Sequence, residues 1–253
     1  MEPLNFVEKG QGPMIVLSHA LGLDMAMWDA VAALLEPRFT VLRYDHRGHG
    51  HSPAVNAPFT IDDLADDVAA LIRSRTDKPV FFAGISMGGM TAQALAVRAP
   101  ELLAGIVIAN SGAHYPDQAP WKARVERVLS LGVESIADGA VDRWLTPAFR
   151  ATEQGDAMAA QLRATLIGTD AVSYSAACDA VAGIDYRESN RRIAIPTLVV
   201  AGTLDLATPP SMSQEIAAAI PGAQLRTIDA AHISSAEKPG ELAALIEFFV
   251  NQA

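Results

Sequence analysis

Cysteine is almost absent from the sequence, which has one, Cys178, in 253 residues. A lone thiol cannot form an internal disulfide, and this suits a protein of the reducing cytosol. Basic residues are also few, since 19 Lys and Arg stand against 29 Asp and Glu and give a net charge of −10. An acidic chain is repelled by nucleic acids and anionic membranes, so we expect neither as a partner.

Long apolar segments are missing as well. No apolar run approaches the roughly 20 residues that a membrane-spanning helix needs. Residues 1–12 lack the basic and apolar regions of a secretory signal, so we expect a cytoplasmic protein. No glycine-rich phosphate-binding pattern follows a strand, which leaves a nucleotide cofactor without support. Half of the residues are apolar, enough for one large domain or for a core domain with an insertion.

The most informative stretch begins with an apolar run over residues 80–83, which predicts a buried strand, and continues into a helix-like segment over 90–98. Between them the pattern Gly-x-Ser-x-Gly places Ser86 at a strand-to-helix turn, the signature of a nucleophile elbow. A Cβ at Gly84 or Gly88 would collide with neighbouring backbone in so tight a turn. An ordinary glycine-rich turn is the alternative. A histidine and an acid later in the chain would favour the nucleophile elbow over this alternative.

Strands and helices alternate along much of the chain. A continuous apolar run indicates a strand that is covered on both faces. This alternation predicts an α/β fold with a mostly parallel central sheet and helices on both faces. The predicted strands are 4–7, 14–17, 40–44, 80–83, 105–109, 197–201 and 224–228.

The alternation stops between the strands at 105–109 and 197–201. Residues 115–190 contain no apolar strand, and four helix-like segments are separated there by Gly and Pro. We therefore predict a helical cap over residues 115–190, inserted into a core domain that is formed by residues 1–114 and 191–253.

A nucleophilic serine needs a base within hydrogen-bond reach and an acid that orients the base. Of the six histidines, only His232 comes after both Ser86 and a suitable acid, Asp205, in the order that an elbow serine requires. Each of the three follows a predicted strand directly, and the carboxyl ends of parallel strands meet at one edge of the sheet. Taken singly, Asp205 reads as a turn residue and His232 as a loop histidine. Their order and placement together favour a catalytic triad.

Two backbone N–H groups are expected to stabilise the oxyanion that forms during attack by Ser86. One belongs to Met87, the residue after the nucleophile, and the other to Leu21, in the loop after the strand at 14–17. His19, in the same loop, is expected to hold the loop in place rather than to act as a second base.

A metal site is the rival interpretation of the closely spaced His46, His49 and His51. No Cys or Glu completes a ligand shell around them, so we predict no metal. Cys178 lies in a predicted cap helix between Ala and Asp, which lack the basic character that activates a thiol, and is expected to be an apolar filler.

Five features together resemble the α/β-hydrolase superfamily over essentially the whole chain: the loops at 18–22 and 45–50, the elbow, and the loops of Asp205 and His232. Within it the chain resembles the 3-oxoadipate enol-lactonase family. The matching segments are residues 84–90, 143–150, 174–178, 205–210 and 230–234. The loop Ser-His-Ala-Leu-Gly at 18–22 departs from the Asn-Ser or His-Gly expected before Leu-Gly.

The resemblance implies hydrolysis of 3-oxoadipate enol-lactone, an enol lactone that bears a carboxylate, to 3-oxoadipate in the β-ketoadipate pathway of aromatic catabolism. It implies an acyl-enzyme on Ser86, with no metal or organic cofactor. The partner is then a small anionic lactone or ester, and the oligomeric state stays open.

The substrate carboxylate needs a cation, ideally a bidentate arginine. The cap offers Arg124, Arg127, Arg143 and Arg150. The predicted substrate-binding set is Trp121, Arg127, Arg143, Trp144 and Arg150. The alternative for each arginine is a solvated helix face, and for each tryptophan the core of the cap.

The same triad also serves other reactions, because function depends on the site rather than on the fold. A general carboxylesterase or another lactonase is the nearest alternative. A non-hydrolytic enzyme of the same fold (a perhydrolase or a cofactor-free oxygenase) and a ligand receptor that keeps the triad are further alternatives.

Overall fold

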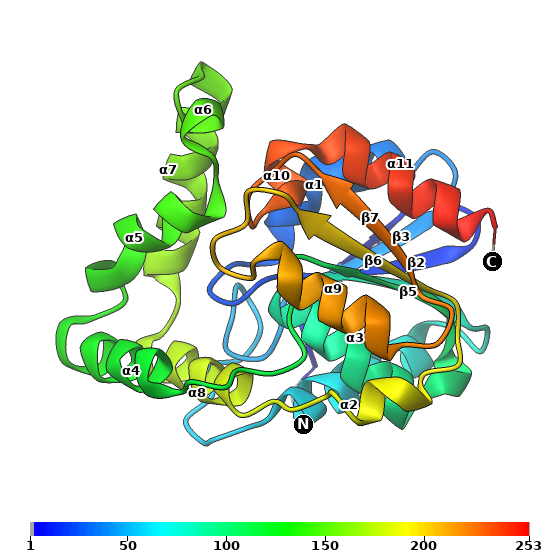
Figure 1. Ribbon diagram of the computed structural model, residues 1–253, viewed down its shortest axis with the longest axis horizontal. Helices are drawn as coiled ribbons and strands as arrows, with labels where there is room; N and C mark the ends of the chain where they lie inside the picture. The colour runs from blue at the N-terminus through cyan, green and yellow to red at the C-terminus, as the bar shows by residue number, and fades with distance from the viewer. Residues whose placement is uncertain (1–2, 253) are drawn as a thin grey trace.

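A mostly parallel sheet lies at the centre of the protein, which we describe from a computed structural model over residues 3–252. Within those residues the sheet has seven strands in the order β1-β3-β2-β4-β5-β6-β7 (Figure 1). Their bounds are β1 (Phe6–Lys9), β2 (Met14–Ser18), β3 (Thr40–Tyr44), β4 (Val80–Ile85), β5 (Leu103–Ala109), β6 (Thr197–Gly202) and β7 (Gln224–Ile228). Among them β1 alone pairs antiparallel, with β3. The predicted fold class is confirmed.

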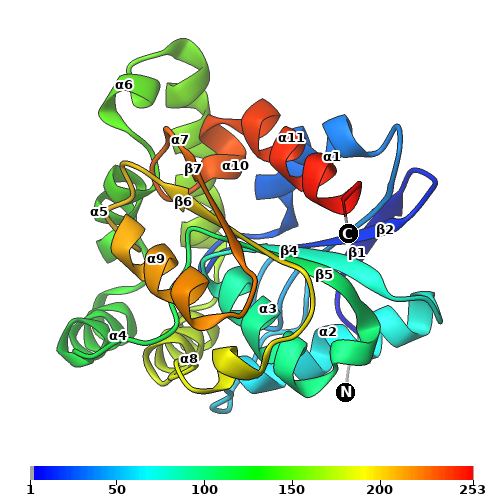
Figure 2. The same ribbon diagram turned by 45° about the vertical axis from the view of Figure 1, so that its right-hand side comes forward.

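Helices cover both faces of the sheet, as Figures 1 and 2 show. One face carries α1 (Asp29–Leu35), α10 (Ser234–Glu237) and α11 (Pro239–Val250), and the other carries α2 (Ile61–Arg75), α3 (Met87–Arg98) and α9 (Pro210–Ala219). Three short 3-10 helices add η1 (Met25–Trp28), η2 (Pro100–Leu102) and η3 (Ser189–Arg192). No helix within residues 3–252 has both the length and the apolar character to cross a membrane.

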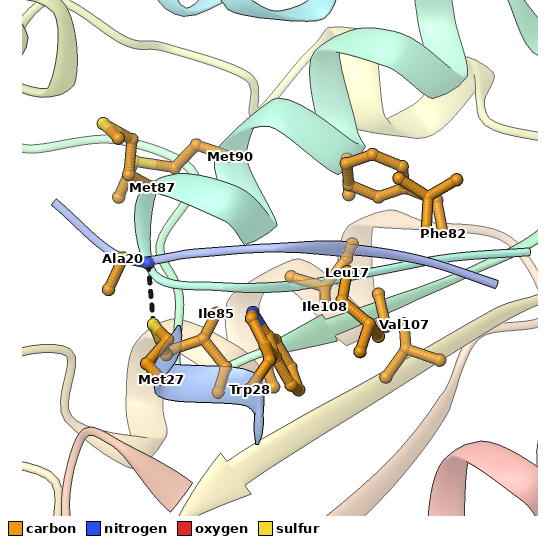
Figure 3. Close-up of a cluster of buried hydrophobic side chains, with 14 of the residues drawn as sticks. Leu17, Ala20, Met27, Trp28, Phe82, Ile85, Met87, Met90, Val107 and Ile108 are labelled. Carbon is orange, nitrogen blue, oxygen red and sulfur yellow. Dashed lines mark hydrogen bonds between the residues drawn. The ribbon is translucent and has the colours of Figure 1, made fainter. Parts of the chain in front are cut away.

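The core lies between the sheet and these helices. Figure 3 shows part of it, with Phe82 and Trp28 on opposite sides of β2 and with the strand residues Leu17, Val107 and Ile108 close to them. These five side chains are almost fully buried. Burying one large apolar side chain contributes about 1.5–3 kcal/mol, so the core fixes the strand order that the site depends on.

Five α-helices lie between β5 and β6, ahead of the 3-10 helix η3. They are α4 (Ala119–Leu131), α5 (Glu134–Trp144), α6 (Pro147–Arg150), α7 (Glu153–Gly168) and α8 (Ala171–Ala182). Figure 1 shows α4 to α7, in green, beside the end of the sheet toward which the arrow of β6 points. The helices fall within the segment 115–190 that we predicted as a cap, and the division into core and cap stays a prediction.

Candidate active site

Ser86 occupies the turn between β4 and α3. Its φ of 56° lies in the left-handed region, which is strained for a residue with a side chain. A Cβ at Gly84 would lie 2.1 Å from the carbonyl oxygen of Gly88, and a Cβ at Gly88 would lie 2.2 Å from that of Ser18. Both distances are far inside van der Waals contact, so this tight turn requires both glycines, as the sequence predicted.

Asp205 lies in the loop after β6 with its carboxylate buried. Its Oδ1 accepts hydrogen bonds from the backbone N–H groups of Ala207, at 2.8 Å, and Thr208, at 2.9 Å. Its Oδ2 accepts from Thr208 Oγ1 at 2.8 Å. Burial alone would raise the pKa of Asp205, but His232 and the hydrogen bonds from Thr208 and Asn110 lower it to about 2. The carboxylate is therefore ionised at neutral pH.

His232 lies after β7 and contacts this carboxylate. Its Nδ1 is 2.9 Å from Asp205 Oδ2, so Nδ1 carries the proton and Nε2 is left to accept one. His232 and Ser86 line the same cavity. The structure thus brings together the three residues predicted as the triad, each at the carboxyl end of a parallel strand.

Asn110 is a residue of this site that sequence reasoning missed. Its side chain is fully buried and its φ is 47°. Its Nδ2 donates to Asp205 Oδ2 at 3.0 Å and to the carbonyl of Ala231 at 3.1 Å, while its Oδ1 accepts from Ser234 Oγ at 2.7 Å. Asn110 therefore joins the loops of the acid and the base. Its position directly after β5, at the same sheet edge, was the available signal.

The two backbone groups proposed for the oxyanion are both placed near Ser86. Met87 is the first residue of α3, so its N–H has no partner within the helix. Leu21 lines the same cavity as Ser86 and His232. An oxyanion between these two N–H groups would also lie at the positive end of the helix dipole of α3.

His19 fixes the peptide group that carries the Leu21 N–H. Its Nε2 accepts from the backbone N–H of His46 at 2.9 Å, so its Nδ1 carries the proton and donates to the carbonyl of Ala20 at 2.8 Å. In a trans peptide the C=O and the following N–H point in opposite directions. Holding the Ala20 carbonyl therefore sets the direction of the Leu21 N–H. Ala20 is held further by a hydrogen bond from its own N–H to Met27 Sδ, 3.3 Å away (Figure 3).

The cavity at Ser86 has a volume of about 140 Å³. Aromatic rings and two guanidinium groups form most of its wall. The lining residues are Leu21, Ser86, Tyr115, Trp121, Arg124, Ala140, Arg143, Trp144, Tyr174, Leu206, Ala207, Thr208 and His232. The arrangement suits nucleophilic attack on the carbonyl of a small molecule that carries a negative charge.

Comparison with known proteins agrees with this geometry. Residues 13–239 match the α/β hydrolase fold family. The chain belongs to this family. It is 36% identical over 238 residues to 3-oxoadipate enol-lactonase 2 of Acinetobacter baylyi, covering 93% of this chain and 88% of the relative.

Solved structures of α/β hydrolases give the same result. The crystal structure of the enol-lactonase from Burkholderia xenovorans LB400 superposes with a TM-score of 0.94 at 35% identity, covering 98% of this chain and 96% of that one. A thermophilic esterase from Thermogutta terrifontis superposes with a TM-score of 0.92 at 27% identity, covering 98% and 93%. The chain is therefore an ester-bond hydrolase of the α/β-hydrolase family.

The four arginines named from the predicted cap divide into two groups. Arg124 and Arg143 line the cavity. Arg124 lies 4.9 Å from the ring centroid of Trp121. Burial, followed by repulsion from Arg124, lowers the pKa of Arg143, which places the two positive groups close to each other. Of the predicted substrate-binding set, Trp121, Arg143 and Trp144 lie in the wall.

Arg127 and Arg150 are the two members of the predicted set that do not lie there: within residues 3–252, neither is among the lining side chains. Arg127 is exposed on α4, one turn beyond Arg124 and about 4.5 Å farther along the helix axis. Arg150 Nη1 instead donates to Asp142 Oδ1 at 2.6 Å. Arg124, which we named as a cap cation but left out of the set, takes their place.

Two of the three histidines that suggested a metal site have side-chain contacts of another kind. His46 Nε2 is 2.9 Å from Ser18 Oγ, and His49 Nδ1 is 3.1 Å from the carbonyl of Arg47. Within residues 3–252 no group of three or more His, Cys, Asp or Glu side chains is arranged to hold a metal ion. Burial lowers the pKa of His49 to about 4 and, with repulsion from neighbouring histidines, that of His46 well below its ordinary value.

Proposed function

We propose that this hydrolase opens 3-oxoadipate enol-lactone to 3-oxoadipate through an acyl-enzyme on Ser86. The relatives named as enol-lactonases support this substrate. The observation that carries the proposal is the pair Arg124 and Arg143 in the wall of the cavity that holds Ser86. The cytoplasmic location, the pathway, and the exclusion of nucleic acids and membranes stay predictions from the sequence.

The proposed reaction begins when His232 Nε2 takes the proton of the Ser86 hydroxyl and Oγ attacks the lactone carbonyl. The tetrahedral oxyanion accepts hydrogen bonds from the N–H groups of Leu21 and Met87. Its collapse breaks the ring C–O bond and expels an enolate, which takes the proton that His232 received from Ser86 and becomes a ketone, so that His232 is neutral again. His232 then takes a proton from water, and the hydroxide attacks the acyl-enzyme. This attack frees the second carboxylate and returns the proton to Ser86.

Two arginines beside a nucleophile need an explanation in a chain with a net charge of −10. Neither Arg124 nor Arg143 forms an ion pair with a carboxylate of residues 3–252. Two neighbouring positive groups repel each other, and a bound carboxylate between them would remove that repulsion. A carboxylate that accepts charge-assisted hydrogen bonds from them gains about 1.5–3 kcal/mol per bond.

Substitution of these arginines tests the substrate class. Replacing Arg124 or Arg143 by Gln should lower kcat/KM for the enol lactone by about 10- to 100-fold, mainly through KM. Turnover of the neutral ester p-nitrophenyl acetate should stay within about twofold. The matched control is Arg127→Gln, the same change on the same helix but outside the cavity, and it should alter neither substrate. Equal losses on both substrates, or no loss on the lactone, would contradict the proposal.

A general carboxylesterase is the second candidate. The likeness to the thermophilic esterase favours it, and the same triad serves both activities. For this candidate, p-nitrophenyl acetate and simple lactones would be turned over at least as well as the enol lactone. Replacing Arg124 or Arg143 would then lower kcat/KM for the enol lactone no more than for the neutral ester.

A further inference from the structure

The backbone on both sides of His232 is attached to neighbouring groups by hydrogen bonds. The N–H of Ile233, the next residue, donates to the carbonyl of Trp144 at 3.0 Å. The N–H of Ala231, the preceding residue, donates to Glu237 Oε2 at 3.1 Å. Trp144 ends α5, between β5 and β6, and its side chain lines the cavity. The position of the base is thus tied to a segment far from it in sequence.

Glu237 connects the same two parts of the chain. Besides the N–H of Ala231, its carboxylate accepts from the backbone N–H of Thr146 at 3.2 Å and from Thr146 Oγ1. Glu237 is 9% exposed and Thr146 7%. Within residues 3–252, no Lys or Arg pairs with this carboxylate. A buried carboxylate without a cation depends on its hydrogen-bond donors. One of the three donors to Glu237 belongs to the loop of the base, and the other two belong to Thr146.

We infer that Glu237 is a positioning residue, which holds His232 in register with residues 144–146. Trp144 of this three-residue segment lines the cavity, and the segment also contacts both neighbours of the base, one directly and one through Glu237. Residues 144–146, together with Glu237, therefore set both the position of the substrate against Trp144 and the position of the imidazole. The inference rests on the proposed role of His232 as base, and it does not depend on which ester is the substrate.

The catalytic consequence comes from the sensitivity of proton transfer to distance. A displacement of about 1 Å in a reacting group can lower the rate about 100-fold. Loss of the Glu237 contacts would release the N–H of Ala231 and let the imidazole move relative to Ser86. The effect should appear in kcat for every ester, because the base acts on all of them.

Two substitutions separate the reach of Glu237 from its charge. In Glu237→Gln, the amide oxygen can accept from the two N–H groups, and the amide nitrogen can donate to the Thr146 hydroxyl, which rotates to accept. This variant keeps the reach without the charge. Glu237→Asp keeps the charge but is shorter by one carbon–carbon bond, about 1.5 Å. It cannot bridge the two segments without movement of the backbone.

The experiment compares kcat and KM of the two variants on the enol lactone and on p-nitrophenyl acetate, well below the measured thermal unfolding temperature of each. Glu237→Asp should lose about 10- to 100-fold in kcat on both substrates with KM within about twofold. Glu237→Gln should stay within about threefold of the wild type, with an unchanged acidic limb of its pH–rate profile. Wild-type kcat in Glu237→Asp would overturn the inference, as would equal losses in both variants or a shifted acidic limb in Glu237→Gln.

A second pair keeps the test decisive if the Glu237 variants fold poorly. Thr146→Val removes the hydroxyl that donates to the carboxylate, and Thr146→Ser keeps it. The valine variant should lose several-fold in kcat on both substrates, and the serine variant should restore it; equal activity in both would overturn the inference.

Ser86→Ala separates this test from the proposed mechanism. If Ser86→Ala keeps normal turnover, the acyl-enzyme mechanism itself fails, whereas an inactive Ser86→Ala with a fully active Glu237→Asp rejects only the role of Glu237.

Discussion

Single residues of the site act mainly by holding backbone groups in place. Asn110 joins the acid loop to the base loop, and Glu237 joins the base loop to Thr146. His19 holds the carbonyl of Ala20 and, through the same peptide plane, the N–H of Leu21. None of the three belongs to the proposed triad, yet each fixes the position of a group that the mechanism needs.

Substitution of His19 tests the orientation of the oxyanion site. An Asn side chain can keep the donor to the Ala20 carbonyl at the position of Nδ1, whereas a Gln side chain can keep the acceptor for the His46 N–H at the position of Nε2. His19→Gln should lower kcat by about 100-fold, since loss of one oxyanion donor costs about that much, while KM stays within about threefold. His19→Asn should lose clearly less, and the comparison requires only steady-state kinetics on p-nitrophenyl acetate. Equal losses in the two variants would show that the Ala20 carbonyl does not transmit the effect.

At the scale of elements, the sequence predicted the features that depend on local patterns of residues. The seven predicted strands match the seven strands of residues 3–252 to within a few residues. The triad could be predicted because each member directly follows a strand. The wall of the cavity could not, since the choice between Arg124 and Arg127 depends on how α4 packs. The partners of Asn110 are far away in the chain, as is Thr146 from Glu237, so no local spacing indicates these contacts.

The turn at Ser86 is an element with almost no tolerance for extra atoms. Gly84→Ala places a methyl group 2.1 Å from a backbone oxygen, so the strand and helix must separate. We expect a loss of more than about 3 kcal/mol in the free energy of unfolding, and no hydrolysis by any folded fraction. The matched control is Gly168→Ala at the end of α7, where nothing lies within 4 Å of the added carbon. Chemical denaturation should show this control unchanged or stabilised by up to about 1 kcal/mol, and a stable Gly84→Ala would contradict the observed turn.

The loop after β3 should make the protein sensitive to mild acid. The pKa of His49 is lowered to about 4 by burial, so the folded chain keeps this ring neutral while the unfolded chain binds a proton below about pH 6.5. Stability from this residue is therefore complete at higher pH and decreases as the pH falls through 6.5 toward 4. We expect the free energy of unfolding, measured in urea, to fall between pH 7.5 and pH 5.5 by about 1 kcal/mol less in His49→Gln than in the wild type. An identical pH dependence in both proteins would mean that His49 is not held neutral.

At the scale of the whole molecule, the fold places two positive side chains, Arg124 and Arg143, beside Ser86, where the reaction is proposed to occur. The net charge of −10 disfavours an anionic ligand over most of the surface, and Arg124 and Arg143 reverse that tendency inside the cavity. The parallel sheet supplies the triad at one edge, and the helices between β5 and β6 supply both arginines. Under the proposed function, the reaction and its selectivity thus come from different segments of the chain.

A serine hydrolase with this cavity should select an anionic enol lactone. The most direct measurement is kcat/KM of the wild-type protein for 3-oxoadipate enol-lactone and for the methyl ester of its side-chain carboxylate, assayed side by side. The two compounds share the ring and its reactive carbonyl and differ in charge. We predict a preference of at least about 10-fold for the free acid, the value of one charge-assisted hydrogen bond. An equal or higher kcat/KM for ring opening of the methyl ester would contradict it.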